Sequence, residues 1–139
     1  MTDKTVLGFD FGTKYIGVAV GQTVTCTANP LVSLHAKNGV PDWEKVTSLI
    51  QQWLPDALIV GIPFAQDGST HHITRAAQQF AAALETRYKL PIHTVDERYT
   101  TVEAKRHLFE QGGFRALNKQ SVDGLAAKII VETGLRELG

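Results

Sequence analysis

Short apolar runs separated by tight polar breaks make up the first part of the chain. The runs at 6–11 and 15–20 are divided only by Gly12-Thr13-Lys14, and a third extended run covers about 24–34. Short β-prone runs with such breaks are typical of antiparallel strands joined as hairpins. The sequence therefore predicts a three-stranded antiparallel meander in this part of the chain.

From residue 41 onward the apolar pattern alternates between helical and strand-like spacing. Between residues 41 and 55 apolar side chains recur at helical spacing, with a proline at either end. The runs at 57–60 and 91–95 are short, continuous and apolar, as in strands buried on both faces. An amphipathic helix is predicted between these runs over 73–88, and a further helix is predicted over 100–112.

The order of these elements indicates an α/β fold. A strand separated from the previous strand by a helix usually pairs parallel to it, with a right-handed connection. The meander and the two later strands therefore give a mixed five-stranded sheet flanked by helices, and a loop at 114–120 precedes the last helix. The chain has 139 residues, so we expect residues 1–139 to form a single domain.

Composition and charge narrow the class of protein. Apolar residues make up 43% of the chain and charged residues 20%, as in soluble globular proteins. Cys26 is the only cysteine, and no apolar run reaches the ~20 residues of a membrane span. We therefore expect a cytoplasmic protein with no membrane partner. The formal net charge of zero argues against a protein that coats nucleic acid, but it allows a nuclease whose acidic site binds metal.

Asp10 is the first candidate for chemistry, because it lies inside an apolar strand. A buried carboxylate is costly unless it is paired or bound to metal. The alternative is that strand alternation directs Asp10 to a solvated face. The Gly12-Thr13-Lys14 segment that follows favours the functional interpretation, since backbone N–H groups, a hydroxyl and an ammonium together suit a phosphate.

Two later segments carry the other candidate acids. Asp96 and Glu97 end a strand, where neighbouring residues point to opposite faces, so at most one of them is directed at a common site. Glu97 as a solvated loop charge remains an alternative. Asp123 shares the packing face of the last helix with Ala127 and Ile130 by i+4 and i+7 spacing. The alternative for Asp123 is a first-turn acid that stabilises the helix dipole.

Three carboxylates from two strands and a helix suit hard, oxygen-seeking cations, so we expect Mg²⁺ or Mn²⁺ bound by Asp10, Glu97 and Asp123. Two such ions about 4 Å apart activate water and stabilise the leaving oxygen in phosphoryl transfer. Basic side chains near these acids are then expected to hold the nucleic-acid backbone, with Arg98 and Lys119 preferred. The tryptophans at helical spacing are interpreted as packing residues, and the His71-His72 pair is not interpreted as a metal site.

Four motifs resemble those of the YqgF family, also called RuvX. They read LGFDFGTKYIGVA at 7–19, VGIP at 60–63 followed by DGS at 67–69, DERYTTVEA at 96–104 and KQSVDGLAA at 119–127. The resemblance implies a ribonuclease-H-like fold and maturation of ribosomal RNA, with resolution of Holliday junctions as the older suggestion. Within these motifs the family's acidic positions correspond to Asp10, Glu97 and Asp123, and the expected substrate contacts are Thr13, Lys14, Arg98, Thr101 and Lys119.

Three alternatives remain open at this point. A four-way DNA junction is an alternative substrate to precursor 16S ribosomal RNA, and the chain is expected to act as a monomer or a homodimer. A noncatalytic RNA-binding or assembly module is the second alternative. The third is an actin-like ATPase or sugar kinase, whose first phosphate motif resembles Gly8–Thr13 but whose nucleotide site needs two such domains.

Overall fold

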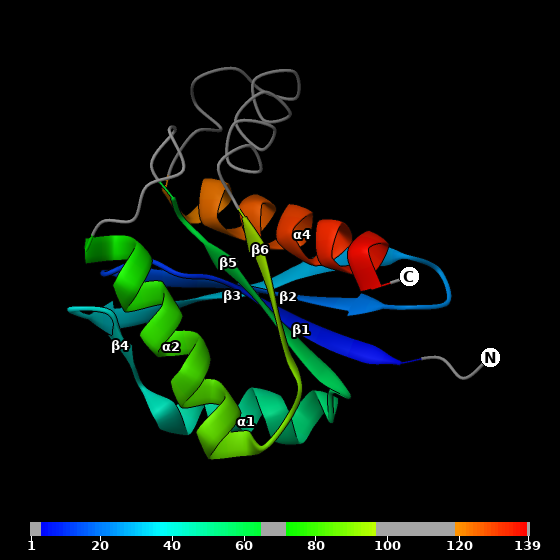
Figure 1. Ribbon diagram of the computed structural model, residues 1–139, viewed down its shortest axis with the longest axis horizontal. Coiled ribbons are helices and arrows are strands. Elements are labelled where there is room, and N and C mark those ends of the chain that lie inside the picture. The colour runs from blue at the N-terminus through cyan, green and yellow to red at the C-terminus, as the bar shows by residue number, and fades with distance from the viewer. Residues whose placement is uncertain (1–3, 65–71, 97–118, 139) are drawn as a thin grey trace.

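A single mixed sheet with helices on both faces forms the framework of the protein (Figure 1). The computed structural model describes residues 4–64, 72–96 and 119–138, with side chains of the last segment described from Leu125 onward. Within these residues six strands lie in the order β4-β3-β2-β1-β5-β6. The strands are β1 (Thr5–Asp10), β2 (Tyr15–Gln22), β3 (Thr27–Lys37), β4 (Val40–Pro41), β5 (Ala57–Ile62) and β6 (Ile92–Asp96). The helices are α1 (Trp43–Trp53), α2 (His72–Tyr88) and α4 (Lys119–Leu138).

The strand directions confirm the predicted topology. β1, β2 and β3 pair antiparallel, whereas β1 with β5 and β5 with β6 pair parallel. The predicted helix over 73–88 is α2, and α4 begins at Lys119, inside the segment expected to be a loop. The helix predicted over 100–112 lies outside the described residues.

The prediction of five strands is wrong by one, because a short edge strand follows β3. Asn38 and Gly39 have positive φ angles of 51° and 81°, which lets them close a tight hairpin between β3 and β4. Asn-Gly is the dipeptide that favours such turns most strongly. β4 has only two residues since Pro41 lacks an N–H and α1 begins at Trp43.

The ends of α1 follow from local chemistry. The Asp42 side chain accepts a hydrogen bond from the Glu44 N–H at 3.0 Å, which caps the first turn. At the other end Leu54 adopts a left-handed conformation (φ 46°), and its N–H donates to the Ile50 carbonyl at 2.8 Å. Pro55 follows and prevents the helix from continuing.

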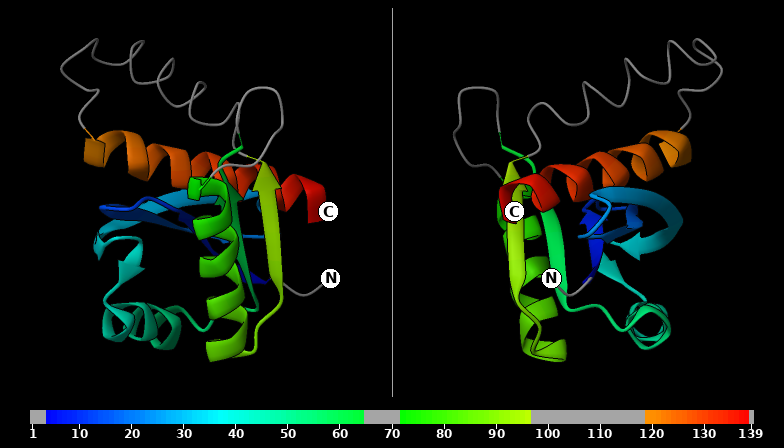
Figure 2. Two further views of the ribbon diagram at one scale, coloured as in Figure 1. Left: turned by 60° about the vertical axis from the view of Figure 1, so that its left-hand side comes forward. Right: turned by 90° about the vertical axis from the view of Figure 1, so that its right-hand side faces the viewer.

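Strand alternation gives the sheet two different hydrophobic faces. One face packs against α1 and α2 through large side chains, with Phe9, Leu58 and Phe80 in its core. The other face packs against α4, with Val131 and Ile130 of the helix in its core. Figure 2 shows α4 separated from α1 and α2 by the sheet. No helix in the described ranges is long and apolar enough to span a membrane.

Helix α4 lies unusually close to the sheet, and glycines make this possible. A Cβ added at Gly8 would lie 2.1 Å from Cγ2 of Val131, and one added at Gly21 would lie 2.4 Å from its Cγ1. Within the helix, a Cβ added at Gly134 would lie 2.7 Å from Cδ1 of Ile59. The helix backbone therefore sits where side chains would normally hold it away.

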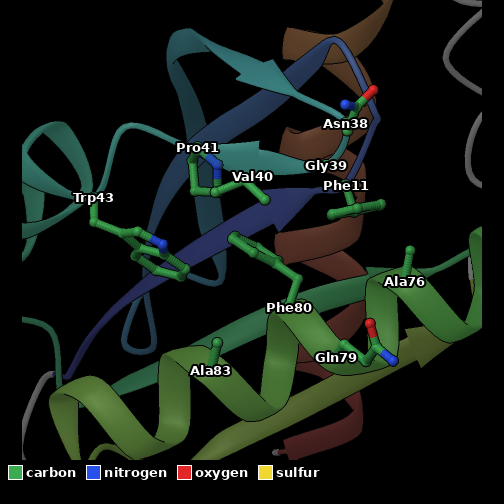
Figure 3. Close-up of a pocket in the computed structure, with 10 residues that line it drawn as sticks. All are labelled: Phe11, Asn38, Gly39, Val40, Pro41, Trp43, Ala76, Gln79, Phe80 and Ala83. Atoms are coloured by element: carbon green, nitrogen blue, oxygen red, sulfur yellow. The ribbon is translucent and has the colours of Figure 1, made fainter.

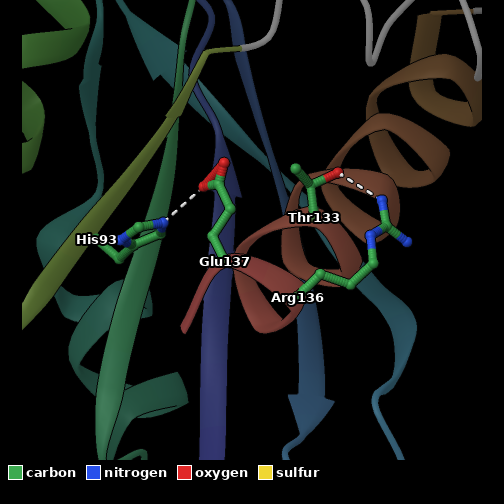
Figure 4. A network of polar contacts seen from close by, with 4 residues as sticks. All are labelled: His93, Thr133, Arg136 and Glu137. Carbon is green, nitrogen blue, oxygen red and sulfur yellow. Dashed lines mark hydrogen bonds and ion pairs between the residues drawn. The ribbon is translucent and has the colours of Figure 1, made fainter. Parts of the chain in front are cut away.

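The C-terminal part of α4 is also attached to the edge of the sheet. Nε2 of His93 in β6 lies 2.7 Å from Oε1 of Glu137 (Figure 4). One residue earlier, Arg136 donates to the Thr133 hydroxyl at 3.3 Å within the helix. α4 therefore packs on the sheet from Ala127 to Leu135 and is joined by this polar contact to the outermost parallel strand.

Candidate active site

Asp10 is the last residue of β1, and its side chain is only 8% exposed. Val6, four residues earlier on the strand, packs in the core beneath α4. Gly8, two residues earlier, brings its backbone against Val131 of that helix. Asp10 shares this face by alternation, while its neighbours Phe9 and Phe11 pack in the core beneath α1 and α2. The alternative in which Asp10 points to a solvated face is therefore wrong.

The strands on either side of Asp10 contribute no side chain next to it. Its partner in β2 is Gly17 and its partner in β5 is Gly61, and both glycines are buried. Directly paired residues on neighbouring strands point to the same face. At the two positions paired directly with Asp10, the neighbouring strands therefore offer backbone alone, and the next side chain in this row beyond Gly61 is Val95 of β6.

The register of β6 assigns Asp96 to one face of the sheet. Val95 pairs with Gly61 and belongs to the core beneath α4, which places it on the Asp10 face. Asp96 pairs with Ile62, and Ile62 packs in the core beneath α1 and α2. Asp96 is therefore assigned to the opposite face, where its side chain is exposed. Glu97, Arg98 and Thr101 lie outside the described residues.

The packing face predicted for the last helix is confirmed. Ala127 and Ile130 are both fully buried, and Val131 lies over Gly8 of β1. In Figures 1 and 2, α4 begins on the side of the sheet where β1 ends and runs back toward the chain's N-terminus. Position 123 is in the second turn of this helix, and the side chains of Asp123 and Lys119 are not among those described.

The turn between β1 and β2 is fixed by backbone contacts. The Thr13 carbonyl accepts from the Gly39 N–H at 3.0 Å, and the Lys14 carbonyl accepts from the Ala36 N–H at 2.8 Å. A Cβ added at Gly12 would lie 2.4 Å from the Tyr15 carbonyl oxygen, so the turn excludes a larger residue there. The Thr13 and Lys14 side chains are exposed at the end of the sheet that carries Asp10.

Ser33 is a polar residue of this row that the sequence did not indicate. It pairs with Gly17, which pairs in turn with Asp10, so all three point to the α4 face. Among the described residues, its hydroxyl oxygen is buried and has no hydrogen-bond partner. No sequence signal marks it, because the register between β2 and β3 shifts at Val18 and Ala19 and disturbs simple alternation.

The donor chemistry at Asp10 fits a divalent cation. A nearly buried carboxylate with no neighbouring cross-strand side chain offers hard oxygen ligands, as Mg²⁺ and Mn²⁺ require. Asp10 is the one member of the predicted triad whose side chain the structure describes. Consistent with that, the described residues contain no group of three or more His, Cys, Asp or Glu side chains able to hold a metal.

Sequence comparison places the chain in a family. The family model "RuvX: Holliday junction resolvase" matches residues 4–137. The chain belongs to the RuvX family. A relative from Proteus mirabilis named "Putative pre-16S rRNA nuclease" is 51% identical over 133 residues, which is 96% of each chain. One of the same name from Legionella pneumophila strain Philadelphia 1 is 53% identical over 131 residues, 94% of each chain.

Solved structures confirm the ribonuclease-H-like fold that the family resemblance implied. "T. thermophilus RuvC in complex with Holliday junction substrate" matches with a TM-score of 0.59 and 17% identity, covering 98% of this RuvX chain and 96% of that chain. The fowlpox virus resolvase in complex with Holliday junction DNA matches with a TM-score of 0.56 and 13% identity, over 96% and 98%. At such low identities the match establishes the fold alone.

Proposed function

We propose that this RuvX chain is a metal-dependent nuclease that hydrolyses phosphodiesters, with precursor 16S ribosomal RNA as its substrate during ribosome biogenesis. The observation that carries the proposal is the buried carboxylate of Asp10 at the end of β1, flanked by Gly17 and Gly61. The names of relatives about half identical over nearly the full chain support the substrate class.

The proposed catalytic and metal-binding set is Asp10, Glu97 and Asp123. Continued alternation in β6 supports Glu97 rather than Asp96, since residue 97 is two positions after Val95 on the Asp10 face. The burial of Ala127 on the sheet side of α4 supports Asp123, which precedes it by one turn. The carboxylates would hold Mg²⁺ or Mn²⁺.

Each part of the chain has a distinct role in this proposal. A bound divalent ion would lower the pKa of a water molecule and would stabilise negative charge on the phosphate and on the leaving oxygen. Asp10 would hold the ion through its carboxylate at the end of β1, where the residue is only 8% exposed. Thr13 and Lys14, together with Arg98, Thr101 and Lys119, would bind backbone phosphates and so position the strand without reading its sequence.

Resolution of four-way DNA junctions is the second candidate function. It is favoured by the family description and by the shared fold with RuvC and the fowlpox enzyme. A resolvase must make paired, symmetric cuts, which needs two active sites, so a homodimer belongs to this candidate and a monomer suffices for the first. In both cases we propose that residues 1–139 form one nuclease domain and act in the cytoplasm.

The test is cleavage of a substrate panel by the wild type and by Asp10→Asn, with Mg²⁺ or Mn²⁺. The panel contains a precursor 16S ribosomal RNA fragment, unstructured single-stranded RNA, duplex DNA and a four-way junction. We expect metal-dependent cutting of the precursor RNA that Asp10→Asn lowers by roughly 10³-fold or more. Preferred and symmetric cutting of the four-way junction would instead support the second candidate, junction resolution.

Wild-type protein that binds RNA as tightly as Asp10→Asn but cuts no substrate would contradict the nuclease and support a noncatalytic binding module. Thermal unfolding of both proteins serves as the control for folding. The substitution removes a charge without changing the size of the side chain, so a loss of activity with unchanged unfolding is a loss of chemistry.

A further inference from the structure

A cavity of about 190 Å³ lies between the β3–β4 hairpin and α2, on the sheet face opposite Asp10 (Figure 3). Phe80 of α2 lies at its centre, with Trp43 at one end and Phe11 at the other. Val40, which is 58% exposed, lies on the hairpin side. The cavity is therefore open to solvent but lined mainly by apolar and aromatic groups.

Small residues create this space. Ala76 and Ala83 are seven positions apart on α2, so they lie on one helix face on either side of Phe80. On the hairpin, Gly39 adds no side chain, and a Cβ there would lie 2.9 Å from Cζ of Phe11. Larger residues at Ala76 or Ala83 would fill a volume that the fold keeps open.

The aromatic rings form a connected row that leads toward Asp10. Trp43 stacks near Phe80 with ring centroids 5.9 Å apart and planes at 25°. Phe80 in turn lies 5.5 Å from Phe11. Phe11 directly follows Asp10 in the chain, so the cavity begins at the strand end that carries the carboxylate. Both sheet faces are accessible from such an end, which is where ligands bind in open α/β sheets.

The polar groups around the cavity suit a nucleobase attached to a phosphate. The exposed amides of Asn38 and Gln79 line it, and an amide both donates and accepts, as the edge of any base requires. Three exposed cations, Lys14, Lys37 and Arg75, are close in sequence to the residues at the Phe11 end of the cavity. At the far end the Arg87 guanidinium lies 4.1 Å from the Trp43 ring, and the acids Asp42 and Glu44 are close by in the chain, so charges of both signs meet there. The three cations at the Phe11 end favour a negative backbone there, near Asp10.

We propose that this cavity binds one unpaired nucleobase of the strand whose phosphate is held at Asp10. The inference rests on the proposed nuclease function and deepens it, because it makes a single-stranded stretch beside the cut part of the substrate. Aromatic surfaces and small apolar walls accept any base face, and the two amides contact its edge. A fully paired duplex has no base free to enter.

The test compares Ala83→Leu, which fills the cavity, with Ala82→Leu, an exposed neighbour on the same helix that does not line it. Both are made in an Asp10→Asn background to prevent cutting, and binding of labelled RNA is followed by fluorescence anisotropy with Mg²⁺. We expect Ala83→Leu to weaken binding of single-stranded RNA by about tenfold, the effect of losing one stacked base. Binding of a duplex of the same sequence should change less than about twofold in either variant.

A scan with abasic nucleotides makes the test specific. In the Ala82→Leu protein, one abasic position in the RNA should weaken binding by about tenfold, whereas in Ala83→Leu the same position should have no further effect. Equal binding by the two leucine variants, or no sensitive abasic position, overturns the inference. So does an Ala83→Leu defect seen only when a protein partner is added, which would assign the cavity to a protein side chain.

The two proposals fail in different ways. If the protein with native Asp10 cuts RNA and Ala83→Leu in that same protein leaves the cut site and rate unchanged, the nuclease stands and the base cavity is overturned. If the native protein neither binds nor cuts any nucleic acid, both are overturned. Thermal unfolding of Ala83→Leu, expected to match that of Ala82→Leu, shows that lost binding is not lost folding.

Discussion

The two faces of the sheet are packed by opposite means. On the face covered by α1 and α2, large rings fill the space, and Phe9 meets Phe80 edge to face with centroids 5.7 Å apart. On the face covered by α4, the helix rests on strand backbone at Gly8 and Gly21. The first arrangement depends on side-chain volume and the second on its absence.

The proposed function gives a reason for this difference. In the proposed site a strand acid and a helix acid share a metal ion, and the helix must then lie close to the sheet, because carboxylates that share an ion approach within a few ångströms of it. Glycines on the α4 face permit this approach. The aromatic face has no such requirement, and there the spaces left by Ala76 and Ala83 form a cavity instead.

The largest expected difference between the two faces is in the cleavage rate after an acid on each face is replaced. We expect Glu97→Gln to lower the cleavage rate by roughly 10³-fold, about 4 kcal/mol of transition-state stabilisation. Asp96→Asn should stay within about threefold of wild type, because the register assigns Asp96 to the other face. Single-turnover cleavage of the best substrate measures both. A large loss in Asp96→Asn together with an active Glu97→Gln would reverse the assignment of the faces.

On the aromatic face, truncation should be the damaging change. Phe80 is 4% exposed and contacts the rings of Phe9, Phe11 and Trp43, so Phe80→Ala should lower the free energy of unfolding by about 3–5 kcal/mol. Urea denaturation measures the loss. Gln78→Ala, at an exposed position of the same helix, is the control and should change it by less than about 0.5 kcal/mol.

On the α4 face, enlargement should be the damaging change. Gly8→Ala places a Cβ 2.1 Å from Val131 Cγ2, and the overpacking should cost about 1–3 kcal/mol of unfolding free energy. Removing the opposing methyl groups tests the cause, so Gly8→Ala should cost much less when it is introduced into Val131→Ala. An equal cost in both backgrounds would show that the close contact is not the source of the loss.

The smallest effect compares one buried hydroxyl from each face. Thr74 of α2 is fully buried and donates to the Pro63 carbonyl, so Thr74→Val should destabilise the fold by about 1–3 kcal/mol. The buried Ser33 hydroxyl has no hydrogen-bond partner among the described residues, so Ser33→Ala should leave stability unchanged or raise it by up to about 1 kcal/mol. Calorimetric unfolding measures both. A clear loss of stability in Ser33→Ala would indicate a partner formed in solution.

Local signals in the sequence were sufficient for much of the fold. Tight breaks such as Gly12-Thr13-Lys14 predicted the meander, and the helix between two prolines is α1. The tryptophans were interpreted as packing residues, and Trp43 indeed packs on Phe80 and beneath the Arg87 guanidinium at 4.1 Å. The Asn38-Gly39 hairpin also carried a local signal, which the sequence analysis did not use.

Other features depended on register, which local signals do not contain. The strand pattern alone did not distinguish Asp96 from Glu97, although the family motif favoured Glu97. Only the pairing of Val95 with Gly61 and of Asp96 with Ile62 assigned Asp96 to a face of the sheet. Likewise, Ser33 joined the Asp10 row only through a strand pairing that includes a register shift. One residue of slippage would move every side chain of a strand to the other face, so register cannot be inferred from composition.

The sequence by itself determined the α/β class, the order of the strands along the chain and the family, and it predicted Asp10, Glu97 and Asp123 as the acids of the site. These depend on periodicity and on motifs contiguous in the chain. The tertiary structure alone decided which faces of the sheet Asp10 and Asp96 occupy, how closely α4 approaches Gly8, and that Ala76, Ala83 and Gly39 leave a cavity beside Phe11. The physical reason is that such contacts join residues distant in sequence, and their geometry is fixed only when the whole sheet and its helices pack together.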